Sequence, residues 1–189
     1  YSCMFVIKNN YYLYIENTNS IDLNCIKNSK KISIIYRNNK VPESIETLRI
    51  FRKKCKVKGF KLYISNNIKL LRNCGADGLY ISSYNKKIYM CQNIELLGSA
   101  HSFKEINEKI KQGCKTIFLS RLFKTSYKNK DGNFGVVKFN LIINKYKIPI
   151  VPLGGIRSFN LNKLNMVNSN GLSLLSEIKK KPAISSRLF

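Results

Sequence analysis

Residues 148–158 read IPIVPLGGIRS, an apolar run that ends in two consecutive glycines and an arginine-containing turn. A run that is apolar at nearly every position is typical of a strand covered on both faces in a parallel sheet. A glycine pair at the end of such a strand either allows a backbone turn with positive φ or lets another group approach its N–H groups closely. The stretch therefore predicts a buried parallel strand, with a turn or a binding loop at Gly154 and Gly155.

Seven other runs rich in Ile, Val, Leu, Tyr and Phe have the same character. The eight predicted strands are residues 12–17, 31–37, 61–65, 78–83, 95–101, 116–123, 148–155 and 171–178. Helical periodicity lies between most of them, at 42–59, 66–75, 102–113 and 136–147. This alternation is typical of an open doubly wound sheet or a closed (β/α)8 barrel. Eight strands, with no glycine-rich loop after the first, favour a compact barrel domain over residues 1–189 with a shortened C-terminal helix.

Residues 102–113 illustrate how the predicted helices begin and end. Ser102 followed by Glu105 is a capping box at the start, and Gly113 ends the helix. Ile106 and Ile110 lie one turn apart and are expected on the buried face.

The chain is strongly basic, with 34 Lys and Arg against 10 Asp and Glu and a formal net charge of +24. Such an excess raises nucleic acid as a partner. However, the lysines are scattered along the chain together with Asn and Ile, which indicates compositional bias rather than one basic patch. The six cysteines form no CxxC pair, which is typical of reduced core cysteines in a cytoplasmic protein. The first apolar run is too short to cross a membrane.

In a barrel, functional residues lie at the carboxyl ends of the strands. The predicted loops after the seventh and eighth strands place Gly154, Gly155 and Ser176 where barrels commonly bind phosphate. His101, the only histidine, ends the fifth strand, with Ser99 two residues earlier on the same side. Two readings of His101 stay open, a structural histidine and an acid/base group. Lys128 lies in a long loop from which it can reach an anionic substrate.

The same strand ends offer few carboxylates. Asn66 and Asn85 follow the third and fourth strands, and both are neutral amides. Because Mg²⁺ is usually held by one or two carboxylates, a strong metal site is not expected.

The order of motifs resembles the thiamin-phosphate synthase and TenI family over most of the chain. CGADGLYIS (74–82) is similar to the family's A-G-A-D-G-V-H-L-G segment. LLGSAHS and SRLFKTSYK within 96–128 are similar to I-G-V-S-T-H-S and G-P-I-F-P-T-x-T-K. IPIVPLGGI (148–156) and NGLSLLSEI (170–178) are similar to I-P-V-V-A-I-G-G-I and D-G-V-A-V-V-S-A-I.

The resemblance implies a (β/α)8 barrel that binds a thiazole phosphate at the ends of the seventh and eighth strands. Synthase members join this ligand to an aminopyrimidine pyrophosphate with Mg²⁺, whereas TenI members shift a proton on a thiazole carboxylate phosphate without metal. The matched positions comprise substrate contacts, phosphate contacts and a proposed proton-transfer histidine. They are Arg37, Ser99, Thr125 and Lys128 for substrate, Gly154, Gly155 and Ser176 for phosphate, and His101 for the proton transfer.

The departures from the family pattern fall together in the pyrophosphate half of the site. The family's Q-L-R-E-K segment appears as IYRNNK (35–40), which keeps Arg37. The two magnesium aspartates correspond to Asn66 and Asn85, so a resident metal is not expected unless synthase activity is retained.

The sequence therefore predicts a thiamin-biosynthesis protein that binds a phosphorylated thiazole or pyrimidine ligand, with tautomerase-like or residual synthase chemistry. The alternatives are a working thiamin-phosphate synthase, a ligand binder without catalysis, a different phosphate-binding barrel and a nucleic-acid-binding protein. Candidate catalytic residues are His101 and Lys128. A second copy of the chain is a further candidate partner, and no membrane partner is expected.

Overall fold

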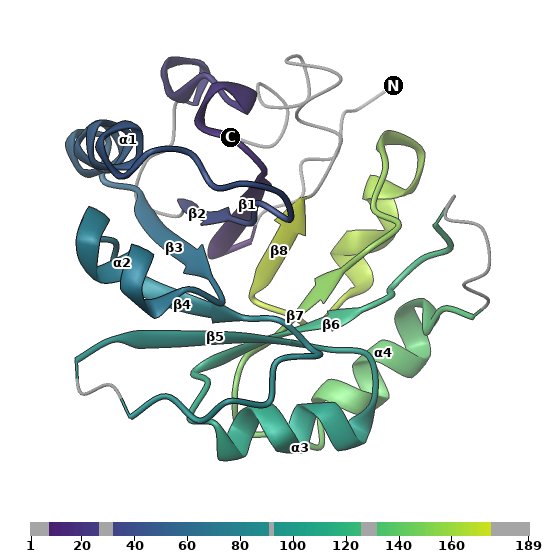
Figure 1. Cartoon of the computed structure of the whole chain (residues 1–189). Coiled ribbons are helices and arrows are strands. Elements are labelled where there is room, and N and C mark those ends of the chain that lie inside the picture. Colours follow the sequence, from purple (N-terminus) through teal and green to yellow (C-terminus); the bar gives the residue numbers. More distant parts are fainter. Residues whose placement is uncertain (1–7, 27–31, 91–92, 126–131, 175–189) are drawn as a thin grey trace.

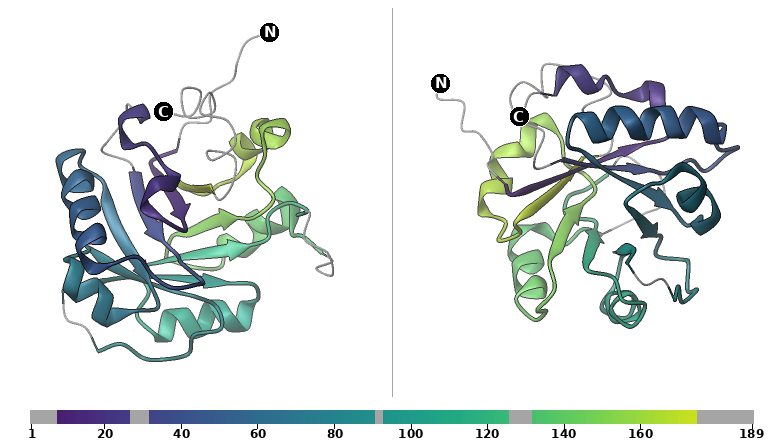
Figure 2. Two further views of the ribbon diagram at one scale, coloured as in Figure 1. Left: turned by 45° about the horizontal axis from the view of Figure 1, so that its top comes forward. Right: turned by 90° about the vertical axis from the view of Figure 1, so that its left-hand side faces the viewer.

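The computed structural model describes residues 8–26, 32–90, 93–125 and 132–174 (Figure 1). Eight parallel strands lie in the order β7-β6-β5-β4-β3-β2-β1-β8. They are β1 Asn10–Ile15, β2 Ile32–Tyr36, β3 Lys61–Ser65, β4 Gly78–Ile81, β5 Glu95–Ala100, β6 Thr116–Ser120, β7 Ile150–Leu153 and β8 Gly171–Leu174. The sheet curls into a nearly closed barrel with helices outside, which confirms the predicted (β/α)8 class (Figures 1 and 2).

The barrel closes between β7 and β8 through serine side chains. Pro152 in β7 has no backbone N–H to donate to a ladder. Ser173 of β8 instead donates its hydroxyl to the Pro152 carbonyl, and the Ser169 hydroxyl donates to the Ile150 carbonyl at 2.8 Å. β8 also pairs with β1, with Tyr12 opposite Ser173. The sheet therefore has both ends joined, and its eight carboxyl ends lie at one end of the barrel, the carboxyl face.

Aromatic side chains fill the inside of the barrel. Tyr14, Tyr80 and Phe118 contact one another with ring centroids 5.5 to 5.8 Å apart, and Tyr12 packs edge-on against Phe118 at 4.8 Å. The other inner apolar residues are Ile35, Tyr63, Leu97, Val151 and Leu153. A separate, larger apolar cluster lies between the strands and the outer helices. Both faces of the strands are thus buried, which explains why their sequences are apolar without alternation.

In the described ranges, four α-helices lie outside the barrel: α1 Ile45–Val57, α2 Ile68–Cys74, α3 Phe103–Lys111 and α4 Gly135–Ile143. Ser102 caps α3 by accepting a hydrogen bond from the Glu105 N–H at 3.3 Å, as predicted. The Glu105 carboxylate accepts from the His101 N–H at 2.6 Å rather than from Ser102, so the capping box is shifted by one residue.

The four described α-helices fall in the four predicted helical segments, and three connections contain no described α-helix. Short 3-10 helices follow β1 (η1 Thr18–Ser20 and η2 Leu23–Cys25) and β7 (η3 Ser158–Met166). The β4–β5 connection is irregular in its described part. Tyr84, Ile88 and Met90 in this connection are exposed, so its described apolar side chains do not form a face that packs on the barrel.

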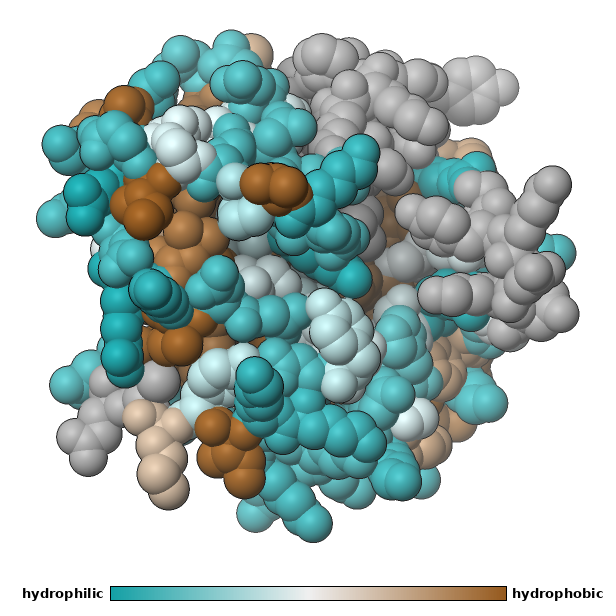
Figure 3. Space-filling model, viewed as in Figure 1, coloured by the Kyte–Doolittle hydropathy of each residue, from teal (hydrophilic) through white to brown (hydrophobic). Residues whose placement is uncertain are grey.

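Hydrophilic side chains cover most of the visible described surface, with apolar side chains gathered on the side of α1 and α2 (Figure 3). Within the described ranges, no helix combines the length and apolar character needed to cross a membrane. Three of the four described cysteines, Cys55, Cys74 and Cys114, are buried and unpaired. Burial raises the pKa of Cys55 to about 12.

Asp77 ties the helical layer to the barrel, and we expect Asp77→Ala to lower the free energy of unfolding by about 2–3 kcal/mol. Its carboxylate accepts from the Arg52 guanidinium at 2.6 Å and from the Leu62 N–H at 2.7 Å, and both donors would lose their partner. Urea denaturation measures the loss. Glu46→Ala, which removes an exposed carboxylate 3.9 Å from Arg49, is the matched control and should cost less than about 0.5 kcal/mol. Equal losses would contradict the structural role of Asp77.

Candidate functional site at the carboxyl face

The structure gathers the described candidate residues at or beyond the carboxyl ends of strands. Arg37 follows β2, Asn66 follows β3, and Asn85 lies in the loop after β4. Ser99 and His101 lie at the end of β5, Thr125 lies beyond β6, and Gly154 and Gly155 follow β7. Lys128 and Ser176 lie outside the described residues. The arrangement is the one expected for a barrel site, where loops at this end converge.

Asn66 and Asn85, from neighbouring loops, hydrogen-bond to each other. The Asn85 side-chain amide donates to the Asn66 Oδ1 at 3.0 Å. The Asn66 backbone has a φ of 57°, in the left-handed region that asparagine tolerates better than most residues. This turn directs the Asn66 amide across the end of β4, where its Oδ1 also accepts from the Ser82 N–H at 2.9 Å.

Nearly every hydrogen-bonding position of these two amides is used within the protein. The Asn66 NH₂ group donates to the Ser82 hydroxyl at 2.8 Å and to the Tyr84 hydroxyl at 3.0 Å. The Asn85 NH₂ group also donates to the Tyr89 hydroxyl at 2.9 Å, and its Oδ1 accepts from the Lys87 N–H at 3.0 Å. Because both lone pairs of the Asn66 Oδ1 are occupied, this oxygen has none left for a cation. In the described part of the chain, no three His, Cys, Asp or Glu side chains lie together as metal ligands.

Lys109 of α3 hydrogen-bonds to the backbone of Asn85. Its burial shows that the buried face predicted for this helix is wrong at Ile110. Lys109 is fully buried whereas Ile110 is 39% exposed. Its ammonium donates to the Asn85 carbonyl at 2.7 Å and to the Gln112 side chain at 2.9 Å. Burial lowers the pKa of Lys109. Gly98 makes room for the lysine stem, since a Cβ at Gly98 would lie 2.9 Å from the Lys109 Cδ. Lys109 thus gives the Asn85 carbonyl, in the irregular loop after β4, a hydrogen-bond donor.

Ser99 and His101 have different environments. Ser99 is 6% exposed and faces the barrel interior, whereas His101 is exposed. Among the described residues, no hydrogen bond involves the His101 imidazole, and none joins it to Ser99. The structure therefore leaves His101 accessible at the rim and does not bring the two side chains together as a pair.

The glycine pair after β7 serves both as a turn and as a close approach. Gly154 and Gly155 have φ angles of 90° and 74°, which favour glycine. A Cβ at Gly155 would lie 2.2 Å from the Phe123 carbonyl oxygen. The Phe123 N–H donates to the Gly154 carbonyl at 3.2 Å. The loops after β6 and β7 are therefore in backbone contact, and this contact requires the glycines.

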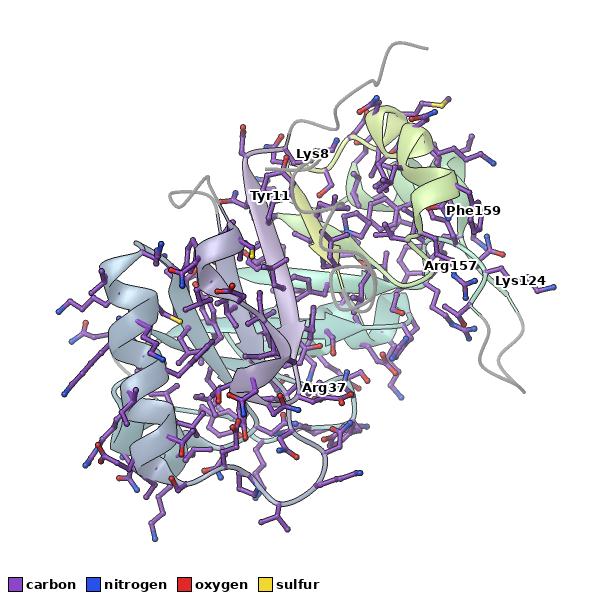
Figure 4. The ribbon with its side chains drawn as sticks, turned by 90° about the horizontal axis from the view of Figure 1, so that it is seen from above. Lys8, Tyr11, Arg37, Lys124, Arg157 and Phe159 are labelled. Atoms are coloured by element: carbon purple, nitrogen blue, oxygen red, sulfur yellow. The ribbon has the colours of Figure 1, made fainter. Side chains whose placement is uncertain are left out.

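Asn160, Arg121, Arg157 and Lys124 were missed by sequence reasoning. Asn160 is buried and organises the loop after β7: its amide donates to the Gly155 carbonyl at 2.8 Å and accepts from the Arg157 N–H at 2.8 Å. Arg121 directs one guanidinium nitrogen to within 3.3 Å of the Thr125 hydroxyl. Figure 4 shows Arg157 and Lys124 on the η3 side of the molecule, and Arg37 near the end of β1. Arg121, Lys124 and Arg157 thus belong to the loops after β6 and β7, and the abundance of lysine and arginine in the sequence hid them.

Comparison with known proteins adds a family relationship. A family model described as thiamine monophosphate synthase matches residues 14–178. The chain is 27% identical to the thiamine-phosphate synthase of Methanobrevibacter smithii, over 92% of this chain and 91% of that protein. It is 29% identical to the thiamine-phosphate synthase of Clostridium acetobutylicum, over 67% of this chain and 62% of that protein. Its match to the Prochlorococcus marinus enzyme, at 26% identity, covers 77% of this chain and 44% of that protein. The chain thus spans less than two thirds of the latter two relatives.

Solved structures share the fold. A thiamine phosphate pyrophosphorylase from Pyrococcus furiosus superposes with a TM-score of 0.76 at 17% identity, over 95% of this chain and 91% of that one. KGPDC from Streptococcus mutans superposes with a TM-score of 0.66 at 10% identity, over 96% and 95% of the two chains.

Proposed function

We propose that this chain, which belongs to the thiamine monophosphate synthase family, binds a thiazole phosphate at the carboxyl face. In this proposal the protein moves a proton on the bound ligand without a metal ion. The observation that carries the metal-independent part is the Asn66–Asn85 hydrogen bond of 3.0 Å. In the family resemblance these two positions carry magnesium aspartates.

The donor set at this pair does not fit Mg²⁺. A hard divalent cation takes oxygen ligands and usually one or two carboxylates. Here the oxygens belong to neutral amides, and the Asn66 Oδ1 already accepts two hydrogen bonds. Binding a cation would break both of them without gaining any carboxylate charge. Departure of pyrophosphate, which depends on metal stabilisation of the leaving charge, is therefore not the chemistry that we propose.

The loop after β7 supports the phosphate half of the proposal. Gly154 and Gly155 carry no side chains, and Asn160 holds the backbone between Gly155 and Arg157 in place. Backbone N–H groups in a positive-φ turn form a concave site suited to anions. The Arg157 and Lys124 side chains add positive charge on the same side of the molecule (Figure 4). In our proposal the phosphate binds at this loop.

His101 is the proposed acid/base group for a proton shift on the bound ring, and Lys128 is a second catalytic candidate. An imidazole changes charge near neutral pH and can both accept and return a proton. The exposed position of His101 suits contact with a ligand arriving at the carboxyl face. Ser99 and Thr125 are proposed to contact the ring and its substituents, and Arg37 its anionic group.

We expect thiazole phosphate to raise the melting temperature of the purified protein with or without Mg²⁺. A ligand that binds only the folded state adds RT ln(1 + [L]/Kd) to its stability, about 2.7 kcal/mol at a hundredfold excess over Kd. For a domain of this size that corresponds to about 5–10 °C. Differential scanning calorimetry measures the shift, and inorganic sulfate at equal ionic strength is the control. No shift at millimolar ligand would contradict the proposed ligand.

The same protein should then be assayed for both family reactions. Proton exchange at the ring without added metal supports the proposed chemistry. Formation of thiamin phosphate from thiazole phosphate and the pyrimidine pyrophosphate would contradict metal independence if it required Mg²⁺. Binding without either reaction would identify a ligand binder. Steep salt dependence of RNA or DNA binding would instead favour the nucleic-acid alternative.

A further inference from the structure

Four tyrosines occupy the barrel interior, and their hydroxyls fall into two pairs. Tyr63 donates its hydroxyl to the Glu95 carboxylate at 2.8 Å, near the amino end of the barrel. Tyr12 has Thr116, at the start of β6, as its polar neighbour. Tyr14 and Tyr80 differ, because neither hydroxyl has a hydrogen-bond partner among the described residues. Tyr14 is 5% exposed and Tyr80 is fully buried, so bulk water does not explain the missing partners.

Strand register places these two hydroxyls below the carboxyl face. Tyr14 of β1 lies opposite Ile35 of β2. Arg37, two residues after Ile35 and just beyond β2, is the next inward position and lies one layer closer to the carboxyl face. Tyr80 pairs with Leu97, and Ser99 is the corresponding next inward position. Burial raises the pKa of both phenols, and the positive charge of Arg37 acts in the opposite direction on both. Arg37 therefore lies near both hydroxyls.

Arg37 also has a buried donor that lacks an acceptor among the described residues. Its Nε is buried and, within the described part of the chain, also has no hydrogen-bond partner. Ser99 and Tyr14 are neighbours of the Tyr80 hydroxyl, but neither completes a hydrogen bond with it. Buried polar atoms in native proteins are nearly always paired, so three orphan donors in two adjacent layers indicate an acceptor that the described residues do not supply. With raised pKa values the phenols stay protonated at neutral pH and present O–H donors.

We propose that Tyr14, Tyr80 and Arg37 form a binding subsite for an anionic oxygen at the buried end of the ligand. The inference rests on the proposed function, since the ligand's phosphate is assigned to the opposite, glycine-loop side of the carboxyl face. Two O–H donors and a guanidinium N–H together suit an anionic acceptor, because the guanidinium can only donate and each hydroxyl can rotate to donate as well. The source of the oxygen is a carboxylate on the ring or a second phosphate, and both have this chemistry.

The test uses Tyr14→Phe combined with Tyr80→Phe, which removes both hydroxyls and keeps both rings. Without ligand, we expect the double variant to melt at the same temperature as the wild type or higher, because no hydrogen bond is lost. Tyr63→Phe is the matched control. It removes a satisfied hydroxyl and should lower the melting temperature by about 2–4 °C.

Ligand affinity, measured by isothermal titration calorimetry, should fall in the double variant and change little in Tyr63→Phe. The probes are thiazole phosphate, the same molecule with a ring carboxylate, and inorganic phosphate. We expect the double variant to lose about 100-fold in affinity for the carboxylate probe, about 10-fold for each hydroxyl, and Tyr63→Phe to lose less than about 3-fold. A hydroxyl-dependent response to inorganic phosphate would support the subsite with phosphate as the source.

Two results with the double variant would overturn the subsite. One is a double variant that binds both anionic probes as tightly as the wild type. The other is a double variant that loses as much thermal stability as Tyr63→Phe, which would mean that the hydroxyls are structurally paired. Wild-type protein that binds thiazole phosphate but gains nothing from the carboxylate or from inorganic phosphate contradicts only the subsite. Wild-type protein that binds no thiazole phosphate contradicts the proposed function, and the inorganic phosphate comparison then decides the subsite separately.

Discussion

The double substitution of Asn66→Asp and Asn85→Asp is expected to destabilise the metal-free protein and to make its stability depend on Mg²⁺. The two side chains now join through a 3.0 Å hydrogen bond, and the variant would bring two carboxylates together there. Two like charges at about 4 Å repel by about 4 kcal/mol at an effective dielectric constant of 20. Because the Ser82, Tyr84 and Tyr89 hydroxyls can rotate to donate, we expect a net loss of about 2–3 kcal/mol at pH 8.

The pH and metal dependence of this loss identify its cause. The folded pair should hold one proton more strongly than the unfolded chain, so stability falls as pH rises through its raised pKa and recovers on acidification. Ten millimolar Mg²⁺ should return most of the loss in the double variant and leave the wild type unchanged. Calorimetric melts at pH 5 and pH 8 measure both effects.

Controls separate the pair from added charge alone. Asn66→Asp by itself should be nearly neutral, because its carboxylate still accepts from the Asn85 amide and the Ser82 N–H. Asn67→Asp adds a charge next door while preserving the cap that accepts from the Leu70 N–H. Equal stabilisation of the wild type and the double variant by Mg²⁺ would contradict the conclusion that the amides exclude the cation. Restored Mg²⁺-dependent binding of the pyrimidine pyrophosphate would show that the rest of that half of the site persists.

The strands were predictable because each local signal agreed with the fold. Runs such as residues 150–153 are buried on both faces, so their sequence is apolar throughout, and the start of α3 carries its own capping serine. The predicted strands ran one to three residues too far at most described carboxyl ends, and the end of the predicted strand 171–178 lies outside the described residues. There the chain already belongs to the loops at the carboxyl face, as at Arg37 and Gly154, whose backbones hydrogen-bond to neighbouring segments of the barrel.

Contacts between loops were not predictable from local pattern. Asn66 and Asn85 were recognised singly as departures from carboxylates, but their mutual hydrogen bond depends on a left-handed turn and on support from Lys109. Lys109 contradicts the usual exposure of lysine, because the space beside Gly98 becomes visible only when α3 is packed on β5. The orphan hydroxyls of Tyr14 and Tyr80 likewise look like ordinary core residues in the sequence.

Gly155→Ala is expected to be the most destabilising of three glycine substitutions that share a positive φ. An alanine in the left-handed region costs about 1–2 kcal/mol by itself. At Gly155 the added Cβ would also lie 2.2 Å from the Phe123 carbonyl oxygen and 2.5 Å from its carbon, both backbone atoms. One of the two loops would have to move, so we expect a total loss of about 4 kcal/mol, or about 8–16 °C in melting temperature.

Two matched variants divide this loss into its parts. Gly75 has a φ of 68° and nothing within 4 Å of an added Cβ, so Gly75→Ala measures the backbone cost alone. Gly154→Ala meets the Arg121 Cγ at 3.0 Å, a flexible side chain that can move aside, and should fall between the other two. Equal losses at all three positions would mean that the glycines provide only the turn. A graded series would show that close contact between the loops after β6 and β7 requires Gly155, which would make the phosphate loop that we propose a product of packing against its neighbour.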